Sequence, residues 1–419
     1  MDLSDIFDEW DIYAEGRALK ERYFDYDAAI ENAERKIVAV TGIRRSGKSS
    51  LLMLLRQRLA KMGAKVCYVN LEDSRIKSHD DALDALLKWF GDEGFMLLDE
   101  ITAIPGWEGW LARVHEQLKG RLKLIISSSR KSLSMPSKPL RGRIVQFELF
   151  PLSFKEYLFF IGARTDNTTA GRGIIEKAFN DYLRYGGFPE IALASNRIDK
   201  IRYLNSYFND IIGLDIAEVS NEEISLVETF ARYALQSSYF SASKCLNFFE
   251  TLGYKIGKER ILKMEKHAQL SYLFSFLPIF SHSIKDIKQY PRKSYSGDTG
   301  FYYGITGRTD LGLPFEALIF LELRRRLKPG NEIAYWKNKN GAEADFLIKQ
   351  GIAVKEIVQV AYAINEKETR NREVTGAIEA CKAFGLKRAT IITSGTESEH
   401  SYEGIKIRFR NVVDWLLYQ

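Results

Sequence analysis

The stretch KIVAVTGIRRSGKSSLL, residues 36–52, decides the fold of this chain. Within it, Gly42–Ser49 fits the phosphate-binding loop pattern G-x-x-x-x-G-K-[ST]. A short apolar strand, Val38–Val40, precedes the loop, and leucines at helical spacing follow it as far as Gly63. The motif needs this context, a strand that ends and a helix that begins. A chance glycine-rich turn is the alternative, and the flanking elements make it the weaker one.

The predicted loop has a specific chemistry. Main-chain N–H groups and the positive end of the helix dipole converge there on an anion. Lys48 is long enough to reach the β- and γ-phosphates of a nucleotide, and Ser49 is placed to bind the accompanying Mg²⁺. We therefore expect ATP and Mg²⁺ as cofactors. The expected nucleotide-binding residues of the loop are Gly42, Ile43, Arg44, Arg45, Ser46, Gly47, Lys48, Ser49 and Ser50.

A second signal is FMLLDE, residues 95–100, in which four apolar residues precede two carboxylates. Such a run is typical of a strand buried on both faces, which presents its last side chains at the edge where the phosphate loop opens. We expect Asp99 to hold Mg²⁺ and Glu100 to act as the general base or to orient the attacking water. An Asp-Glu pair alone is weak evidence, but together with the loop it favours nucleotide hydrolysis over binding alone.

Two further positions are candidates for the same site. Ser127–Ser129 follows the apolar strand Leu122–Ile126, and Ser129 is expected to contact the γ-phosphate or the water. A plain serine-rich turn is an equal alternative. Arg143 is expected to stabilise charge on the transferred phosphoryl group, from the same subunit or a neighbouring one. The alternative for Arg143, a solvated loop arginine, is equally supported.

Composition limits the class of protein. A chain of 419 residues is too long for one core, so we expect two or three domains. The 45% hydrophobic and 28% charged residues are typical of soluble globular proteins. The start of the chain is acidic rather than leader-like, the apolar run Leu270–Phe280 is too short for a bilayer, and three scattered cysteines indicate a reducing compartment. We therefore expect a cytoplasmic protein without membrane contact. The net charge of +6 permits DNA as a partner without requiring it.

The middle of the chain reads as helical. Ile174–Ile216 is interrupted by Gly186-Gly187, and three helical segments follow at Ile224–Leu235, Ser243–Leu252 and Lys258–Tyr272, as in a winged helix-turn-helix. A basic edge there is suited to a phosphate backbone, although an ordinary solvated face is at least as well supported. This edge consists of Lys255, Lys258, Arg260, Lys263 and Lys266.

The last part of the chain, from about Gly312, resembles the restriction-endonuclease-like fold of the PD-(D/E)XK type. A helix carrying Glu316, a hairpin carrying Asp345 and further strands and a helix support this reading. The nuclease chemistry also needs an acid-x-lysine on the next strand, but that strand reads VQVA around Gln359. Glu356 points to the opposite face by alternation, and Lys355 lies too far along the strand, ~13 Å away. We expect a nuclease-like fold without strong nuclease activity, with Glu316 and Asp345 as structural remnants or weak metal ligands.

An ordered set of motifs resembles the prokaryotic AAA+ ATPases that carry a conserved C-terminal domain of unknown function. The resemblance spans nearly the whole chain and implies a helical lid on the nucleotide site and, in many members, assembly into rings. Members usually have Thr-Gly-Ser where this chain has Ser127–Ser129. The motifs are the phosphate loop, Asp99-Glu100, Trp107, Gly142-Arg143, PLSFKEYL from Pro151, YGGFPE at 185–190, Asp298-Thr299-Gly300, Glu316, Tyr335-Trp336 and Glu343–Phe346.

The sequence therefore predicts an α/β protein of four parts: a P-loop ATPase core of AAA+ type with a parallel sheet (1–160), a helical lid (161–220), a winged-helix domain (221–311) and a small nuclease-like α/β domain (312–419). The expected activity is Mg²⁺-dependent ATP hydrolysis, in which nucleotide state is coupled to domain movement. Two alternatives stay open: a nucleic-acid-binding module switched by nucleotide, and a metal-dependent nuclease. ATP and ADP are the expected ligands, while DNA, a partner protein and an oligomeric state remain open.

Overall fold

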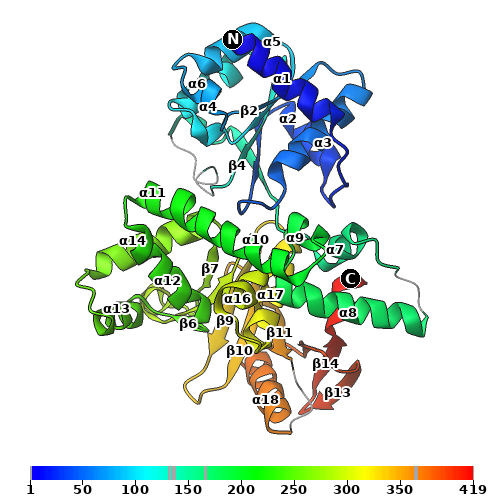
Figure 1. The fold of residues 1–419 in the computed structure, drawn as a ribbon. Helices are drawn as coiled ribbons and strands as arrows, with labels where there is room; N and C mark the ends of the chain where they lie inside the picture. Colours follow the sequence, from blue (N-terminus) through cyan, green and yellow to red (C-terminus); the bar gives the residue numbers. More distant parts are fainter. Residues whose placement is uncertain (1, 131–132, 134–137, 165–167, 363–366, 419) are drawn as a thin grey trace. The chain divides into compact units, whose positions relative to one another are not determined.

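The computed structural model describes residues 2–130, 133, 138–164, 168–362 and 367–418. The chain forms two compact units (Figure 1). The first comprises Met1–Pro151 with Leu270–Tyr272, and the second comprises Leu152–Gln269 with Leu273–Gln419. The further boundaries at residues 220 and 311 remain predictions. Within the described ranges, every helix is too short or too polar to cross a lipid bilayer.

The first unit is built on a five-stranded parallel sheet in the order β2-β3-β4-β1-β5. Strand β4 therefore lies between the strand before the phosphate loop and the strand that ends in Asp99, as the predicted core requires. The strands are β1 (Ile37–Thr41), β2 (Val66–Asn70), β3 (Gly94–Asp99), β4 (Leu122–Ser128) and β5 (Ile144–Glu148).

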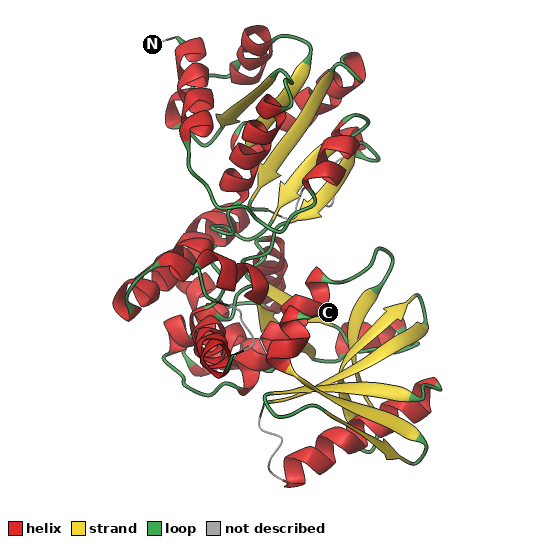
Figure 2. Ribbon diagram, turned by 90° about the vertical axis from the view of Figure 1, so that its right-hand side faces the viewer, coloured by secondary structure: helices red, strands yellow, loops and turns green. Residues whose placement is uncertain are grey.

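Helices cover both faces of this sheet (Figure 2). Successive strand residues alternate between two cores: Ala39 packs in the core that includes α1, α5 and α6, whereas Val38 and Val40 pack against α2 and α3. Because both faces are buried, the strands read as continuous apolar runs. The helices are α1 (Leu3–Gly16), α2 (Tyr26–Ala33), α3 (Lys48–Lys61), α4 (Ser74–Lys77), α5 (Ala82–Phe90) and α6 (Trp107–Gln117), with 3₁₀ turns η1 (Ile101–Ala103) and η3 (Lys138–Leu140).

The second unit begins with helices and a small sheet. The three predicted helical segments are present as α12 (Ile224–Gln236), α13 (Ala242–Thr251) and α14 (Lys258–Leu270), and a three-stranded antiparallel sheet, β6-β8-β7, accompanies them. The winged-helix assignment itself remains a prediction. The other elements of this part are α7 (Phe154–Phe160), α8 (Thr169–Tyr185), α9 (Pro189–Leu193), α10 (Arg197–Asp210), the π-helix η4 (Ile211–Ala217), α11 (Glu218–Ser220), β6 (Tyr239–Phe240), β7 (Phe274–Leu277), α15 (Ile284–Gln289), β8 (Arg292–Ser296) and α16 (Gly300–Thr306).

The second unit ends in a mixed six-stranded sheet in the order β13-β14-β12-β11-β10-β9. The predicted hairpin is formed by β9 and β10, and Gly341 at its turn has φ 89°, a conformation that favours glycine. The elements are α17 (Gly312–Arg325), β9 (Glu332–Lys337), β10 (Glu343–Gln350), β11 (Ala353–Ala361), α18 (Lys367–Phe384), β12 (Arg388–Thr393), β13 (Ser398–Tyr402), β14 (Ile405–Asn411) and α19 (Val412–Leu417).

Two sequence motifs of the second unit meet at one buried carboxylate. Asp298 accepts hydrogen bonds from the main-chain N–H groups of Gly187 and Gly300, each at 2.8 Å. A Cβ atom at Gly186 would lie 1.6 Å from Asp298 Oδ1, so this position has no room for a side chain. The Gly186-Gly187 interruption is therefore a tight corner fixed by Asp298, and burial raises the pKa of that carboxyl to about 7.

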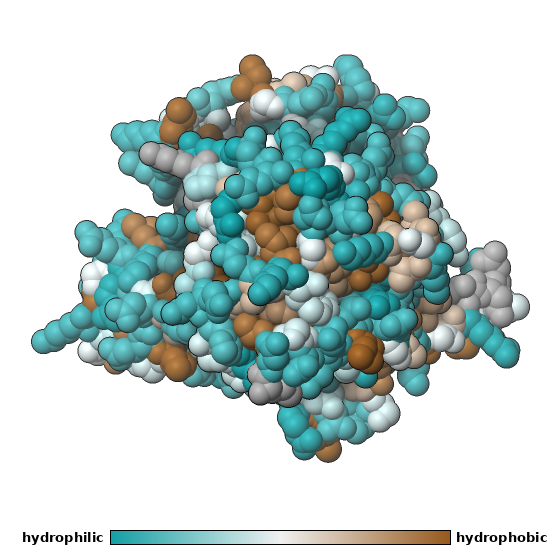
Figure 3. Space-filling view, turned by 90° about the horizontal axis from the view of Figure 1, so that it is seen from above, coloured by the Kyte–Doolittle hydropathy of each residue, from teal (hydrophilic) through white to brown (hydrophobic). Residues whose placement is uncertain are grey.

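On the face shown in Figure 3, hydrophilic residues predominate and hydrophobic ones gather in small groups. Such groups are ordinary on protein surfaces. We infer no binding face from them, and the candidate sites below rest on specific side chains.

Candidate functional site

The phosphate loop joins β1 to α3 with the backbone geometry that an anion cradle needs. Gly47 and the non-glycine Arg45 have φ values of 99° and 71°. A Cβ atom at Gly42 would lie 2.2 Å from the carbonyl oxygen of Leu149, so glycine is required there by close packing. The loop thus curls at the amino end of α3, where main-chain N–H groups are available to a phosphate.

Two buried polar residues, Ser46 and Arg22, lie at this loop. Ser46 Oγ is a buried hydroxyl without a hydrogen-bond partner in the described part of the chain. The guanidinium of Arg22 donates to the carbonyl oxygens of Ser46 at 2.7 Å and Phe150 at 2.9 Å. The sequence analysis missed Arg22, and no local motif marks it. Its contacts make it a positioning residue for the loop.

Lys48 folds back over the loop. Its Nζ donates to the carbonyl oxygens of Gly42 at 3.1 Å and Ile43 at 3.3 Å, and lies 3.5 Å from Glu100 Oε1. The two residues come from different motifs of the sequence. The structure therefore brings the predicted lysine and the predicted base together at one edge of the sheet.

Asp99 is fully buried at the end of β3 and is held by three hydroxyl groups. The Tyr68 hydroxyl donates to Oδ2 at 2.9 Å, Ser127 donates to Oδ1, and Ser49 also forms a side-chain hydrogen bond to this carboxylate. Burial, and then the negative charge of Glu100, raise the pKa of Asp99 above its ordinary value. The two predicted Mg²⁺ ligands, Ser49 and Asp99, are thus in contact.

Glu100 is held in an unusual backbone conformation, with φ 50° in the left-handed region. Its main-chain N–H donates to Ser127 Oγ at 2.9 Å, and its Oε2 accepts from the main-chain N–H of Ser129 at 3.0 Å. The serine-rich tip of β4 therefore orients both carboxylates. Ser129 lies at the site through its main chain, whereas Ser127, which was not singled out, contacts Asp99 directly.

The remaining predicted loop residues are less central. Ile43 is buried, Arg44 lies 3.4 Å from Glu72, and Ser50 is in the first turn of α3. Arg143 lies at the other edge of the sheet, because its carbonyl oxygen pairs with Ile37 at the start of β1 while the phosphate loop follows the end of that strand. Its guanidinium is bonded to Glu116 and to the carbonyl oxygen of Pro139. The structure does not bring Arg143 to the phosphate loop of its own chain, and its role toward the phosphoryl group, from the same subunit or a neighbouring one, remains a prediction.

The residues of this edge fit a nucleotide with its magnesium ion. The orphan hydroxyl of Ser46 and the main-chain N–H groups at the amino end of α3 suit a phosphate group. Ser49 and Asp99 offer a hydroxyl and a carboxylate oxygen, the hard ligands that Mg²⁺ prefers. Lys48 and Glu100 flank these groups.

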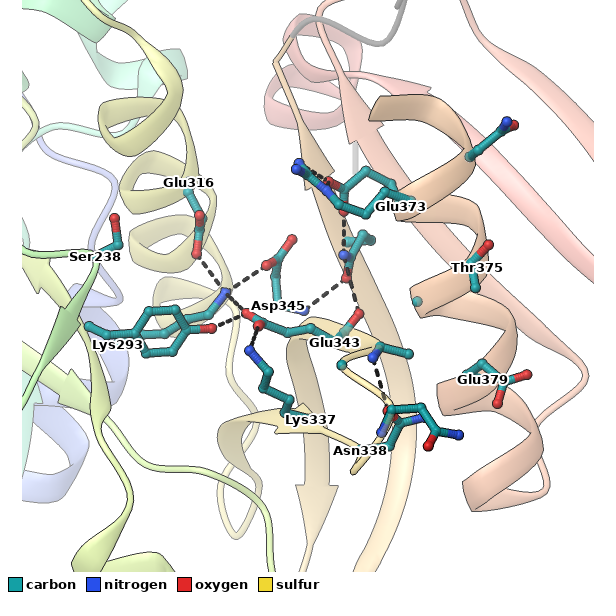
Figure 4. A pocket seen from close by; sticks show the side chains of 18 residues that line it. Ser238, Lys293, Glu316, Lys337, Asn338, Glu343, Asp345, Glu373, Thr375 and Glu379 are labelled. Atoms are coloured by element: carbon teal, nitrogen blue, oxygen red, sulfur yellow. Dashed lines mark hydrogen bonds and ion pairs between the residues drawn. The ribbon is translucent and has the colours of Figure 1, made fainter. Parts of the chain in front are cut away.

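A second polar cluster lies in the second unit, around the predicted residues Glu316 and Asp345 (Figure 4). Glu316 and Asp345 do lie together, but they share a partner that the sequence analysis missed, the ammonium group of Lys293 from β8. Gln359 fills the place of the missing acid: its Oε1 accepts from the main-chain N–H of Asp345 at 2.8 Å. Burial opposes a charge on Lys293, but Asp345 and then Glu316 hold the pKa of Lys293 well above its ordinary value. Lys355, by contrast, is exposed.

Three of the five residues of the predicted basic edge have acidic or polar partners. Arg260 bonds to Glu222 at 2.6 Å, and Lys263 lies 3.5 Å from the same carboxylate. Lys258 donates to Ser243 at 3.0 Å. These contacts favour the ordinary surface reading over a phosphate-backbone site.

Comparisons with known proteins find a domain family that covers the residues of the first site. Residues 34–158 match the AAA domain family, and residues 176–311 match a domain of unknown function, DUF8612. A protein of Haemophilus influenzae, described as uncharacterized, is 24% identical over 91% of this chain and 94% of its own length. The solved structure of a RuvB variant from Thermotoga maritima matches with 16% identity over 60% of this chain and 87% of that chain, at a TM-score of 0.32.

A protein of Methanocaldococcus jannaschii, described as uncharacterized protein MJ1544, is 30% identical over 385 residues, which cover 89% of this chain and 85% of the relative. The similarity thus extends through both compact units. The chain belongs to the same family as MJ1544, and its N-terminal unit is an AAA domain of the P-loop type.

Proposed function

We propose that this protein is a Mg²⁺-dependent ATPase whose catalytic residues are Lys48 and Glu100. One observation carries the proposal: Glu100 Oε1 lies 3.5 Å from Lys48 Nζ, beside Asp99 and the phosphate loop. A carboxylate at this point is close enough to the phosphates to take a proton from an attacking water or to orient it.

Each residue has a separate task in this proposal. The loop amides and Lys48 bind the phosphates, and Lys48 exchanges its contacts with the Gly42 and Ile43 carbonyls for phosphate oxygens. Ser49 and Asp99 would hold a magnesium ion, which would neutralise part of the phosphate charge. Ser129 fixes Glu100 through its main-chain N–H, so that the base is oriented before the substrate binds. Coupling of nucleotide state to domain movement, and DNA or a protein as partner, remain proposals that rest on the AAA+ resemblance.

The test is to separate binding from turnover. We expect Glu100→Gln to bind ATP in calorimetry as wild type does but to hydrolyse it about 10²–10³-fold more slowly. Lys48→Met should lose both affinity and turnover. The matched control is Glu93→Gln, an exposed glutamate just before the same strand, which should hydrolyse ATP normally. Wild-type turnover by Glu100→Gln would refute the assigned base, and absence of ATP binding by wild type would refute the function.

A further inference from the structure

Three carboxylates surround the ammonium group of Lys293. Lys293 Nζ lies 2.6 Å from Asp345 Oδ1, 2.9 Å from Glu316 Oε1 and 3.0 Å from Glu343 Oε1. An ammonium group has three N–H donors, and here it donates to Glu316 and Asp345 and forms an ion pair with Glu343. Lys293 is only 3% exposed. Figure 4 shows its ammonium group at the point on which the carboxylates converge.

The carboxylates are held in place by other groups. The Tyr295 hydroxyl donates to Glu316 Oε1 at 2.6 Å, and the Tyr239 hydroxyl donates to Glu343. The main-chain N–H of Val360 donates to Asp345 Oδ2 at 2.9 Å. The cluster is therefore preorganised by β6, β8 and β11, in addition to the elements that carry its acids.

Three carboxylate oxygens around one point are the ligand set of a hard divalent cation. The centre is taken by nitrogen instead, and the oxygens stand 2.6–3.0 Å from it, farther than the ~2.1 Å that Mg²⁺ requires. Within the described ranges, no group of three or more histidine, cysteine or acidic side chains is arranged to hold a metal ion. The ammonium group of Lys293, which is part of the protein, thus occupies the place where an exchangeable metal ion would bind.

We propose that the ammonium group of Lys293 is the resident cation of this carboxylate site, that it keeps divalent metals out, and that its removal converts the site into a metal-binding one. The exclusion does not come from lack of access. A cavity of about 760 Å³ is lined by Lys293, Glu316, Glu343 and Asp345, so an ion can enter from solvent. Metal-dependent nuclease chemistry is then unavailable to the wild-type site, because its metal position is filled.

The experiment is a Mn²⁺ titration of the full chain without nucleotide, followed by the electron paramagnetic resonance signal of free Mn²⁺. We expect Lys293→Met, which keeps an unbranched side chain, to bind one more Mn²⁺ per chain than wild type. The double variant Lys293→Met/Asp345→Asn should lose that ion. Any Mn²⁺ bound at the phosphate loop is common to all of these proteins and cancels in the comparison.

Several outcomes decide the proposal. Mn²⁺ binding by wild type that disappears in Asp345→Asn would overturn it, as would Mg²⁺-dependent plasmid cleavage that disappears in the same variant. A folded Lys293→Met that binds no additional ion would also overturn it. If Lys293→Met folds only with Mn²⁺ present, the proposal is supported, because the metal then replaces the lost charge. If that variant never folds, the wild-type titration decides alone.

Discussion

Lys48 and Lys293 are both buried lysines next to carboxylates, yet their ammonium groups are held in different ways. Lys48, 5% exposed, has two neutral carbonyl acceptors at 3.1 and 3.3 Å and reaches Glu100 only at 3.5 Å. Lys293, 3% exposed, has three charged acceptors within 3.0 Å. Both ammonium groups are charged donors, but only the carboxylates around Lys293 add the attraction of three full negative charges at short distance. Lys48 is therefore ready to exchange partners, whereas Lys293 is not.

The contacts of a buried lysine indicate its role. A lysine with long, neutral contacts beside an orphan hydroxyl such as Ser46 Oγ is suited to an incoming anion. A lysine surrounded by carboxylates at short distance is suited to compensate their negative charge. Burial alone does not distinguish Lys48 from Lys293, because both side chains are almost completely buried.

The largest expected effect distinguishes the two lysines by stability. Removal of one partner from a buried ion pair typically costs about 3–5 kcal/mol, because the other charge is left uncompensated. We expect Lys293→Met to lower the free energy of unfolding by this amount in metal-free buffer. Lys48→Met, the matched variant, should lower it by clearly less, since its ionic partner Glu100 is at 3.5 Å and its hydrogen bonds are long and to neutral carbonyl oxygens. Urea unfolding followed by circular dichroism measures both.

A further consequence follows for Mn²⁺ in the same experiment. The ion should return part of the lost stability to Lys293→Met and none to Lys48→Met, because a ligand that binds only the folded state stabilises it. Equal destabilisation of the two variants would remove the distinction between an exchangeable and a fixed lysine.

Asp298 extends the comparison from two buried lysines to a buried acid, which is held by main-chain N–H groups. Its folded pKa of about 7 lies above the ordinary 3.8, so between these pH values the folded chain binds more protons than the unfolded one. Stability should therefore fall as pH rises from about 4 to about 7 and then level off. The whole change amounts to at most about 4 kcal/mol for this group.

Urea unfolding at about pH 5 and about pH 8 tests this slope. Asp298→Asn cannot titrate, so its loss of stability between the two pH values should be smaller than that of wild type. Asp310→Asn is the control, because Asp310 also accepts a main-chain N–H, from Gly312, but is exposed. An identical pH dependence of wild type and Asp298→Asn would show that this carboxyl is ionised throughout.

Local motifs made the first site predictable. The phosphate loop and Asp99-Glu100 each carry their chemistry within a few residues, and parallel strands must bring their carboxyl ends to one edge. The predicted helices at 224–235 and 243–252 were found within one residue at each end, because their apolar spacing is regular. Lys355, which was excluded because of its distance along the strand, is exposed, whereas Gln359 is buried.

The missed residues act over long separations in the chain. Arg22 bonds to Phe150, which is 128 positions away, and Lys293 bonds to Asp345, which is 52 positions away. No spacing rule links such pairs. The sequence contained Gly186-Gly187 and Asp298 as separate motifs, but only the packing shows that one fixes the other. The acid-x-lysine motif was expected on the strand around Gln359, but the lysine of this cluster, Lys293, lies on β8.

The smallest expected effect concerns Arg143, which forms a solvent-exposed ion pair with Glu116. Its side chain is 36% exposed and that of Glu116 is 69% exposed, so solvent screens the pair. We expect Arg143→Ala to unfold in urea at the same midpoint as Arg121→Ala, which removes a similarly exposed pair with Asp92. ATP turnover per chain should match wild type at every protein concentration, because Arg143 lies at the edge of the sheet opposite the phosphate loop. A deficit that appears only as the protein is concentrated would instead show that Arg143 serves the site of a neighbouring subunit.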